Sequence, residues 1–378
     1  MPTVISGTDL GLANVHSQGT QGQGIQGQGG VGLYVNTTTG NLVLQQQDQV
    51  LVGQGIDTGL IRTYNSLGQF TDDNGDNFRF AFNQRLVNLT GTANTAGTRI
   101  TRIAGDGSES EFLYDQARGL YITDEGTGAH DTIAYDGITG EWTYTEGTSQ
   151  QQDVYYGTGT GQNERHLIRQ LDTDGNTTTF GYHTNGFIDT ITDASGQVMA
   201  ISYSGDNATE VSTTSNGLTQ TLVRYSYDTQ NRLTQVSIDL SPEDNSVADN
   251  HTYLTQYAYE GDSKRIARVS QSDGTTTAFT YDTQGRVVTV TDGENNTVTY
   301  SYSDAAPETH TTTTQYPLNS DALTPPTAAA PEIYYSVPAN ATVLNQNTLD
   351  LSQMSKLELD SDYFEIEDYS HLNQVASM

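Results

Sequence analysis

Paired acidic and basic side chains are the residues of this sequence that first suggest a chemical role. Aspartates follow tyrosines at several places and an arginine comes shortly afterwards; the set is Asp115, Asp136, Asp228 and Asp282 with Arg118, Arg232 and Arg286. Such a row of charges would suit the recognition of sugars or ions. The same residues also suit a structural role, because Asp favours turn starts and opposite charges on adjacent strands fix register. We favour the structural interpretation.

Two acidic turns resemble calcium loops, because oxygen-bearing side chains occupy every second position. The residues are Asp72, Asn74 and Asp76 in one turn and Asp172, Asp174 and Asn176 in the other. An EF-hand loop needs a carboxylate at its last position, where these stretches have Asn83 and His183. We therefore favour plain β-turns. Ca²⁺ is the one cofactor that these loops would allow, and we expect no other cofactor or metal.

Aromatic side chains offer a second kind of binding chemistry, since a flat ring can stack on a sugar. Trp142 and Tyr144 are the candidate glycan contacts, with Tyr155 and Tyr156 nearby. In a tyrosine-rich β protein most rings pack between strands, and we favour that interpretation.

The sequence gives no indication of catalysis. Cysteine is absent, which excludes disulfides, thiolate metal sites and a thiol nucleophile. The 7 histidines show no metal-binding spacing, and no nucleophile-elbow sequence supports a catalytic triad. We predict that the protein is not an enzyme and has no catalytic residues.

The charge of the chain limits its partners. The 15 basic residues face 46 acidic ones, and the formal net charge is -31. Such a surface repels nucleic acids and anionic lipid headgroups, so neither is an expected partner. The first basic residue is Arg62, and the N-terminal region has no apolar run long enough for a signal peptide or a membrane span.

The chain divides into four parts by composition. Residues 1–30 are a Gly/Gln-rich leader that we expect to be flexible, and residues 31–110 contain alternating apolar residues typical of hairpins. Residues 111–304 form a repeat array, and residues 305–378 are a Pro-containing acidic tail or linker. No stretch has the apolar spacing of an amphipathic helix, so we expect little helix.

Tyrosine marks the repeat. It recurs at positions 114, 135, 156, 182, 203, 227, 259, 281 and 302, mostly about 21 residues apart with a few longer steps. In the unit "FTYDTQGRVVTVTDGENNTVTYSY", Phe279 and Tyr281 share one strand face, and Asp282 begins a turn in which Gly285 supplies a positive φ. Each unit is thus two strands and two turns. Isolated hairpins are marginal and large sheets twist, so the array should form a long antiparallel sheet that coils into a spiral or partial shell.

The repeated stretches resemble the RHS or YD-repeat family. The resemblance rests on "YDTQGRVVTVTDGENNTVTYSY", "YSYDTQNRLTQVSID" and "LDTDGNTTTFGYHTNGFIDTITD", with "YVNTTTGNLVLQQQD" similar to the region that precedes RHS repeats. Its signature residues here are Tyr114, Asp115, Tyr135, Asp136, Tyr182, Tyr227, Asp228, Arg232, Tyr281, Asp282, Gly285 and Arg286. The resemblance implies a β-sheet strip that spirals into a hollow shell, which in bacterial members commonly encloses a toxin.

The sequence departs from that family in three ways. Several units lack the Asp after the tyrosine, the units are fewer than a closed shell should need, and the family's C-terminal autocleavage segment is not found before the tail.

Three hypotheses for function follow. The first is a non-enzymatic RHS-type scaffold, part of a secreted or cell-surface protein without a recognisable signal peptide, which is cytoplasmic before export. It would enclose or present another polypeptide, and its partners would be further RHS segments, cargo or delivery machinery. The alternatives are a carbohydrate-binding adhesive module that contacts surface glycans, and an RHS polymorphic toxin with its activity in the tail.

Overall fold

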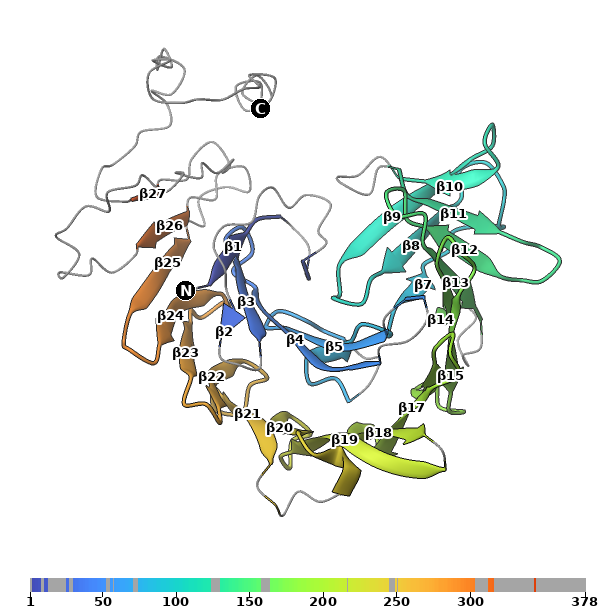
Figure 1. The fold of residues 1–378 in the computed structure, drawn as a ribbon. Helices are drawn as coiled ribbons and strands as arrows, with labels where there is room; N and C mark the ends of the chain where they lie inside the picture. Colours follow the sequence, from blue (N-terminus) through green and yellow to red (C-terminus); the bar gives the residue numbers. More distant parts are fainter. Residues whose placement is uncertain are drawn as a thin grey trace, which may run out of the picture.

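The protein is built from strands. The structure is a computed structural model that describes residues 2–7, 10–12, 25–26, 30–51, 55–56, 58–70, 74–123, 130–157, 164–215, 217–244, 249, 251–302, 312–315 and 343–344. Among these residues the only helical element is the short 3₁₀ turn η2 (Pro242–Asp244). The strands form two sheets, one inside the curve of the other (Figure 1). The prediction of an all-β protein that coils into a partial shell is confirmed.

The first sheet, which we call the N-terminal sheet, contains six strands. They are β1 (Thr3–Ile5), β2 (Ile25–Gln26), β3 (Val31–Asn36), β4 (Leu42–Leu51), β5 (Thr58–Asn65) and β6 (Phe78–Phe80). β3 to β6 pair antiparallel in chain order, whereas β1 lies parallel to β3. The ordered sheet therefore begins within residues 1–30, before the boundary expected from composition.

The second sheet is a long strip in which consecutive strands pair antiparallel through β26. Its first part is β7 (Arg85–Val87), β8 (Arg99–Ile103), β9 (Glu109–Asp115), β10 (Leu120–Ile122), β11 (Thr132–Tyr135), β12 (Trp142–Thr145), β13 (Gln152–Tyr156) and β14 (Arg165–Leu171). β14 also pairs with β7, through Arg165 opposite Leu86 and His166 opposite Arg85, which closes this part on itself.

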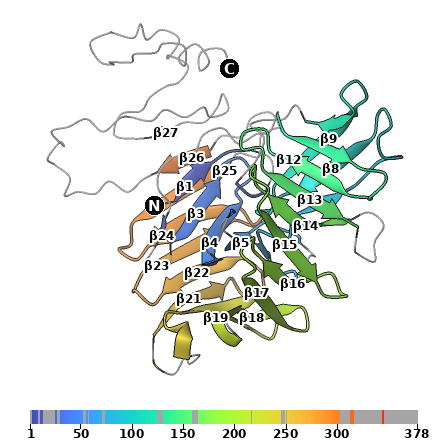
Figure 2. The same ribbon diagram turned by 45° about the vertical axis from the view of Figure 1, so that its right-hand side comes forward.

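The strip continues from β14 into what we call the repeat wall, strands β15–β25 (Figure 2). These are β15 (Thr177–Tyr182), β16 (Ile188–Thr192), β17 (Val198–Ser204), β18 (Asn207–Ser215), β19 (Leu218–Tyr227), β20 (Leu233–Asp239), β21 (Thr252–Tyr259), β22 (Ile266–Gln271), β23 (Thr276–Tyr281), β24 (Val287–Asp292) and β25 (Thr297–Tyr302). Beyond it lie β26 (Thr312–Gln315) and β27 (Val343–Leu344); the rest of the tail falls outside the described residues.

Hairpin turns in the wall share one hydrogen-bonding pattern. Asp282 Oδ1 accepts hydrogen bonds from the backbone N–H groups of Gln284 and Arg286, both at 2.9 Å. Gly285 has a φ of 83°, as the sequence predicts, because only glycine enters this region without strain. Asp172, Asp193, Asp228 and Asp292 accept from the residues two and four positions later in the same way.

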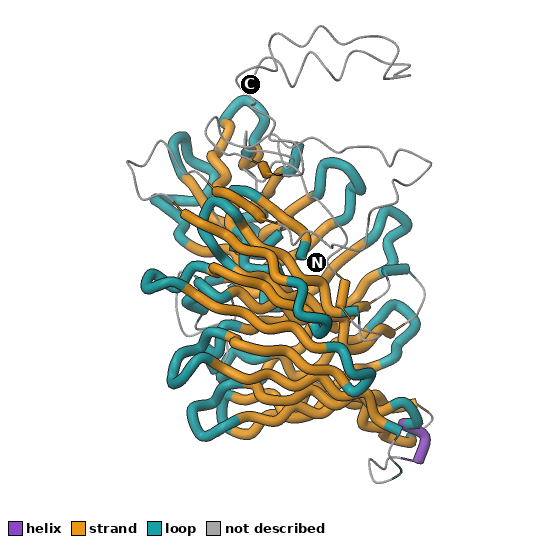
Figure 3. The backbone as a smooth tube through the Cα atoms, turned by 90° about the vertical axis from the view of Figure 1, so that its left-hand side faces the viewer, coloured by secondary structure: helices purple, strands orange, loops and turns teal. Residues whose placement is uncertain are grey.

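Tyrosine and arginine side chains join one unit to the next. Arg286 Nε donates to Asp282 Oδ2 at 2.7 Å, and the guanidinium lies 4.7 Å from the ring centre of Tyr302 in the following unit. Tyr302 Oη donates to the carbonyl of Val287 at 2.8 Å. Equivalent hydroxyl contacts run from Tyr259 to Leu233, from Tyr281 to Ile266 and from Tyr182 to Leu167. The repeat signature is therefore a set of intramolecular contacts that join successive units. Figure 3 shows the strands of these units lying side by side.

The core lies between the two sheets. The wall strands bury alternate side chains, such as Thr277 and Phe279, while Ala278 and Thr280 remain exposed. Aromatic side chains that follow or end the N-terminal sheet meet wall rings in the pairs Phe78–Tyr257, Phe80–Tyr225 and Phe82–Phe180, with centroids 5.2, 5.8 and 5.3 Å apart. The apolar face of the wall is thus covered by another segment of the same chain.

Replacing a turn glycine that has a positive φ should lower the stability of the wall. Gly274 has a φ of 89°, and a methyl group added there would meet no atom within 4 Å. We expect Gly274→Ala to lower the free energy of unfolding by roughly 1–2 kcal/mol, the cost of the left-handed conformation for a residue with a Cβ. Urea denaturation measures the change.

The control is Gly137→Ala, because Gly137 is also in a hairpin turn but is not among the positive-φ glycines. That variant should stay within about 0.5 kcal/mol of the parent protein. Equal losses for both variants would contradict the backbone explanation.

Candidate functional site

The candidate site is the junction between the N-terminal sheet and the repeat wall, where a buried ionic network lies. Arg62, on β5, is 3% exposed, and its guanidinium donates to both carboxylate oxygens of Asp48 at 2.9 and 3.0 Å. It also donates to Tyr257 Oη of the wall at 3.2 Å, and Tyr225 Oη donates to Asp48 at 2.9 Å. Because a buried charge is costly without partners, this network holds the sheet in one position against the wall.

The strand pattern places these charges inside. Side chains alternate along a strand, so Arg62 shares the inward face of β5 with Leu60 and Tyr64, all of them buried. On β4, Gln46 and Asp48 lie on the same buried face as Leu44. The sequence signal for this network is a charged residue in phase with buried apolar residues, as Arg62 is with Leu60 and Tyr64.

The electrostatics keep the network in one protonation state. Burial is the largest single influence and opposes the charge of Arg62, but Asp48 together with Tyr257 and Tyr225 outweighs it and holds the pKa of Arg62 well above its usual value. Burial, together with the Asp48 charge, raises the pKa of Tyr225. Arg62 therefore stays charged and Tyr225 stays protonated throughout the physiological range. The network therefore places a charged guanidinium and a protonated phenol hydroxyl at the junction.

A loop at residues 74–77 extends the junction. Asp76 is 3% exposed, and its carboxylate accepts hydrogen bonds from Phe78 N at 3.0 Å and from Leu233 N at 3.1 Å. Leu233 is the first residue of the wall strand β20. Burial raises the pKa of Asp76 to about 6, and the two backbone donors oppose part of that rise. This carboxylate is thus both a link to the wall and the group in the junction that titrates near neutrality.

The same loop contacts several wall turns in succession. Asn74 Nδ2 donates to Asn207 Oδ1 at 2.8 Å and to the carbonyl of Asn231 at 3.0 Å. Lys264 Nζ donates to the carbonyl of Gly75. The loop therefore bridges the β17–β18, β19–β20 and β21–β22 turns, and it fixes their spacing along the edge of the wall.

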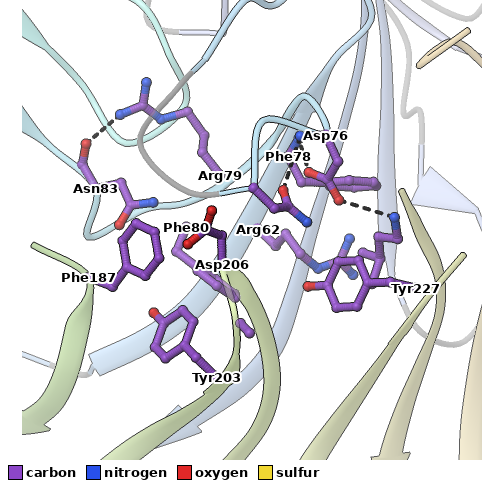
Figure 4. A pocket seen from close by; sticks show the side chains of 13 residues that line it. Arg62, Asp76, Phe78, Arg79, Phe80, Asn83, Phe187, Tyr203, Asp206 and Tyr227 are labelled. Atoms are coloured by element: carbon purple, nitrogen blue, oxygen red, sulfur yellow. Dashed lines mark hydrogen bonds between the residues drawn. The ribbon is translucent and has the colours of Figure 1, made fainter. Parts of the chain in front are cut away.

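A small cavity lies beside this loop (Figure 4). Asp76 and Tyr227 lie on one side of it, and Phe187 and Tyr203 lie on the other. Its volume is ≈ 20 Å³, enough for about one water molecule but not for a substrate. The junction is therefore packed as an interface between two sheets.

A second buried network lies in the closed part of the strip. Arg102, on β8, donates to Asp153 Oδ2 at 3.0 Å and to Tyr155 Oη at 3.1 Å. Its guanidinium is 3.9 Å from the ring centre of Tyr144, and Gln170 donates to the other oxygen of Asp153 at 2.8 Å. Burial is the largest influence on Arg102, yet its tyrosine and aspartate neighbours hold its pKa above the usual value. In both networks, therefore, a buried arginine pairs with an aspartate and donates to a tyrosine hydroxyl group.

The aspartates of the tyrosine–aspartate pairs lie in turns. Asp115 Oδ1 accepts from Ala117 N at 2.8 Å, and Asp136 Oδ1 accepts from Ile138 N at 2.8 Å. The wall aspartates make the corresponding bonds described above. The signature tyrosines pack against the core; they are Tyr114, Tyr135, Tyr182, Tyr227 and Tyr281.

The candidate calcium loops use their oxygens for the turn itself. Asp172 Oδ1 accepts from Asp174 N at 2.9 Å and from Asn176 N at 2.8 Å, and Asn176 Nδ2 donates to Asp172 Oδ2 at 2.7 Å. In the other loop Asp72 lies outside the described residues. Where the chain is described, three or more His, Asp or Glu side chains do not gather into a group that could hold a metal ion.

The candidate glycan contacts are inside the protein. Trp142 is 2% exposed, with its ring centre 4.5 Å from that of Tyr135 and 5.4 Å from that of Tyr121. Tyr144 Oη donates to Asp131 at 2.6 Å. These rings offer no free face to a sugar, and packing between strands accounts for them.

Two family models match parts of the chain. Residues 32–112 match a domain of unknown function, DUF6531, and residues 259–297 match the RHS repeat. No curated protein matches. In the described part of the chain, none of the elements is a helix of the length and apolarity needed to cross a membrane.

Several solved structures match parts of this chain. The complex of TcdB2 and TccC3 without the hypervariable C-terminal region is 14% identical, covering 76% of this chain and 13% of that one, with a TM-score of 0.29. The Tc holotoxin pore of Photorhabdus luminescens, with a mutated TccC3, is 16% identical over 71% of this chain and 12% of that one, with a TM-score of 0.28. A porin-like protein of Bacteroides uniformis is 13% identical over 62% of this chain and 96% of that one, with a TM-score of 0.22. This chain spans about an eighth of the toxin chains that it matches.

Loss of the Arg62 side chain should destabilise the junction. In Arg62→Ala, Asp48 would remain buried without its cation, and we expect the free energy of unfolding to fall by roughly 3–5 kcal/mol. Arg99→Ala removes an arginine whose ion pair with Glu111 is solvent-exposed, and it should cost less than about 1 kcal/mol. Urea unfolding of both variants measures the difference, and similar losses would contradict the role of the buried network.

Titration of Asp76 should make stability depend on pH with a definite sign. Its folded pKa of about 6 exceeds the usual 3.8, so the folded state binds the proton more tightly. The stabilisation is complete below about pH 4 and is lost as the pH rises through about 6. Relative to Asp76→Asn, the parent protein should lose up to roughly 3 kcal/mol between pH 4 and 7, since a tenfold change in acidity corresponds to about 1.4 kcal/mol.

Urea unfolding of both proteins across this pH range measures the effect, because all other titrating groups are common to the two. A stability difference that stays constant with pH would contradict the assignment.

Proposed function

We propose that this chain, in which residues 259–297 match the RHS repeat, is a non-enzymatic scaffold of the RHS type that encloses or presents another polypeptide. The chain would be one section of a larger shell for toxin delivery, with the repeat wall as part of that shell. Its mechanism is steric: a curved sheet keeps a second polypeptide on its inner side and away from solvent.

One observation carries the proposal. The inner face of the wall already holds a polypeptide segment, the N-terminal sheet, mainly through side chains and without continuing its strand ladder. The hairpin turn of that segment approaches the wall closely, since Val287 N donates to the carbonyl of Gly40 at 3.0 Å. A Cβ at Gly40 would lie 2.3 Å from Arg286 Cβ. A wall that binds one segment in this way has the shape and chemistry to hold another.

The side-chain chemistry supports a scaffold over an enzyme. The Asp, Arg and Tyr residues of the repeat signature are engaged in turns and inter-unit contacts, and the two buried arginine networks hold fixed charges. The partners of this scaffold would be proteins: further RHS segments, enclosed cargo or delivery machinery. We place its site of action outside the cell or at the cell surface.

Protection of a fused polypeptide tests the proposal. An unfolded marker peptide joined to the C-terminal end of the 378-residue chain should resist proteinase K longer than the same marker on a globular carrier of similar size. The physical reason is that the curved wall restricts the approach of the protease. Gel electrophoresis of timed digests measures the marker's half-life.

The matched variant is Arg62→Ala, which loosens the junction, with Arg99→Ala as its control. Protection should fall in the first variant and persist in the second. A marker that is degraded equally fast on the parent protein and on the globular carrier would contradict the scaffold function.

A further inference from the structure

The turns of the repeat wall lie along two edges that differ in charge (Figure 3). Consecutive strands from β14 to β25 pair antiparallel, so alternate turns lie on the same edge. One edge, which we call the acidic edge, contains the turns at residues 172–176, 193–197, 216–217, 240–251, 272–275 and 293–296. The other, which we call the mixed edge, contains the turns at residues 183–187, 205–206, 228–232, 260–265 and 282–286.

The turns of the acidic edge contain carboxylates but neither lysine nor arginine. Their acidic residues are Asp172, Asp174, Asp193, Glu243, Asp244, Asp249, Asp273 and Glu294. Of these, Asp174, Glu243, Asp273 and Glu294 are exposed. On the mixed edge, by contrast, Arg232, Arg265 and Arg286 form ion pairs with acidic residues of their own turns. Negative charge is therefore concentrated on one edge of the wall.

The aspartate that begins a wall turn generally uses both of its carboxylate oxygens. Oδ1 accepts backbone N–H groups of the turn, as described above, and Oδ2 accepts from the side chain four residues later. These pairs are Asn176–Asp172 at 2.7 Å, Asn296–Asp292 at 3.0 Å, Arg232–Asp228 at 2.8 Å and Arg286–Asp282 at 2.7 Å. In these turns a donor of the same turn thus satisfies the second oxygen.

The turn between β16 and β17 is the exception. Asp193 Oδ1 accepts from Ser195 N at 2.9 Å and from Gln197 N at 2.8 Å. Asp193 is only 4% exposed, yet its Oδ2 has no hydrogen-bond partner among the described residues. The side chain four residues later is Gln197, which is exposed and does not donate to this oxygen. A buried carboxylate oxygen without a donor costs free energy, so a donor supplied by another molecule would be stabilising.

We propose that the acidic edge binds an extended basic segment of another protein, with an arginine or lysine of that segment donating to Asp193 Oδ2. A guanidinium suits this position because Arg232 and Arg286 occupy the equivalent position in their own turns. The exposed carboxylates of the neighbouring turns attract the other basic residues of the segment. This partner is additional to the scaffold role and does not depend on it, since it concerns the turns and not the inner face of the wall.

Strand spacing predicts the sequence pattern of the partner. Neighbouring strands lie about 4.8 Å apart, so successive turns on one edge are about 10 Å apart. An extended peptide advances about 3.3 Å per residue, and three residues span the same distance. A segment with a basic residue at every third position therefore places one cation beside Asp193 and another beside Asp174 in the adjacent turn.

Calorimetric titration with the peptide (Arg-Gly-Ser)5 at physiological salt tests the proposal on the full 378-residue protein. We expect binding, and we expect Gln197→Arg to weaken it at least tenfold, which corresponds to about 1.4 kcal/mol. The reason is that an arginine at this position would itself donate to Asp193 Oδ2. Gln284→Arg makes the same change in net charge in an exposed turn of the mixed edge, and it should change the affinity less than about threefold.

Asp193→Asn provides a second test of the same oxygen. Asparagine retains one oxygen to accept the N–H groups of the turn but has an NH₂ group in place of the second oxygen. Binding should again weaken at least tenfold. Circular dichroism and urea unfolding establish that each variant is folded before titration.

Matched ligands separate this site from general attraction to a chain with a net charge of -31. A peptide with citrulline in place of arginine, a peptide of the same composition with its arginines in one block, and spermine should each bind at least tenfold more weakly. Equal binding of any of the three would overturn the proposal. So would the absence of binding, an unchanged affinity in Gln197→Arg or Asp193→Asn, or an equal loss in Gln284→Arg.

Discussion

The structure depends on one constraint: a curved sheet with an apolar inner face must have that face covered. In this protein the N-terminal sheet covers it, with rings such as Phe78 and Phe80 packed against Tyr257 and Tyr225 of the wall. Hydrophobic contact alone would allow the two layers to slide, since it has no preferred direction. The ion pair between Arg62 and Asp48, tied to the wall tyrosines, removes that freedom because its charges find partners in one arrangement only.

The same constraint explains the separate roles of the repeat residues. Each wall unit must present its apolar face inward, so strand register cannot slip by one residue. The turn aspartates fix where each hairpin ends, and the stacked arginine and tyrosine fix how far the next unit advances. Glu260 takes the place of the aspartate in one unit and still binds Arg265 at 2.7 Å, so the contact survives a longer side chain. Local contacts thus produce curvature over many strands.

The features that can be predicted from the sequence are those that contacts between residues close in the chain determine. Alternation, the tyrosine spacing and the Asp-to-Gly turns sufficed for the hairpins, because a strand or turn is largely determined by residues within a few positions. Arg62 and Tyr257 are 195 positions apart, and Asp76 and Leu233 are 157 apart. Such partners depend on how the strip curls, which no spacing encodes. The burial of Trp142 is partly of this kind: its ring packs on Tyr135 and Tyr121 of nearby strands, but the ring centre also lies 5.0 Å from the guanidinium carbon of Arg165, on the strand β14 that pairs with β7.

The division of the wall into faces determines where it can meet other molecules. Its inner face is occupied by the N-terminal sheet over the region around Tyr225 and Tyr257, and its signature side chains are engaged in turns and inter-unit contacts. Outward side chains make fewer contacts, such as the hydrogen bond from Gln256 Nε2 to Gln235 Oε1 across two strands, and the inward neighbours and backbone ladders supply most of the contacts that hold the strands. The wall therefore packs against its own chain through its inner face and turns its other face to solvent, as the alternation of buried Phe279 with exposed Thr280 shows.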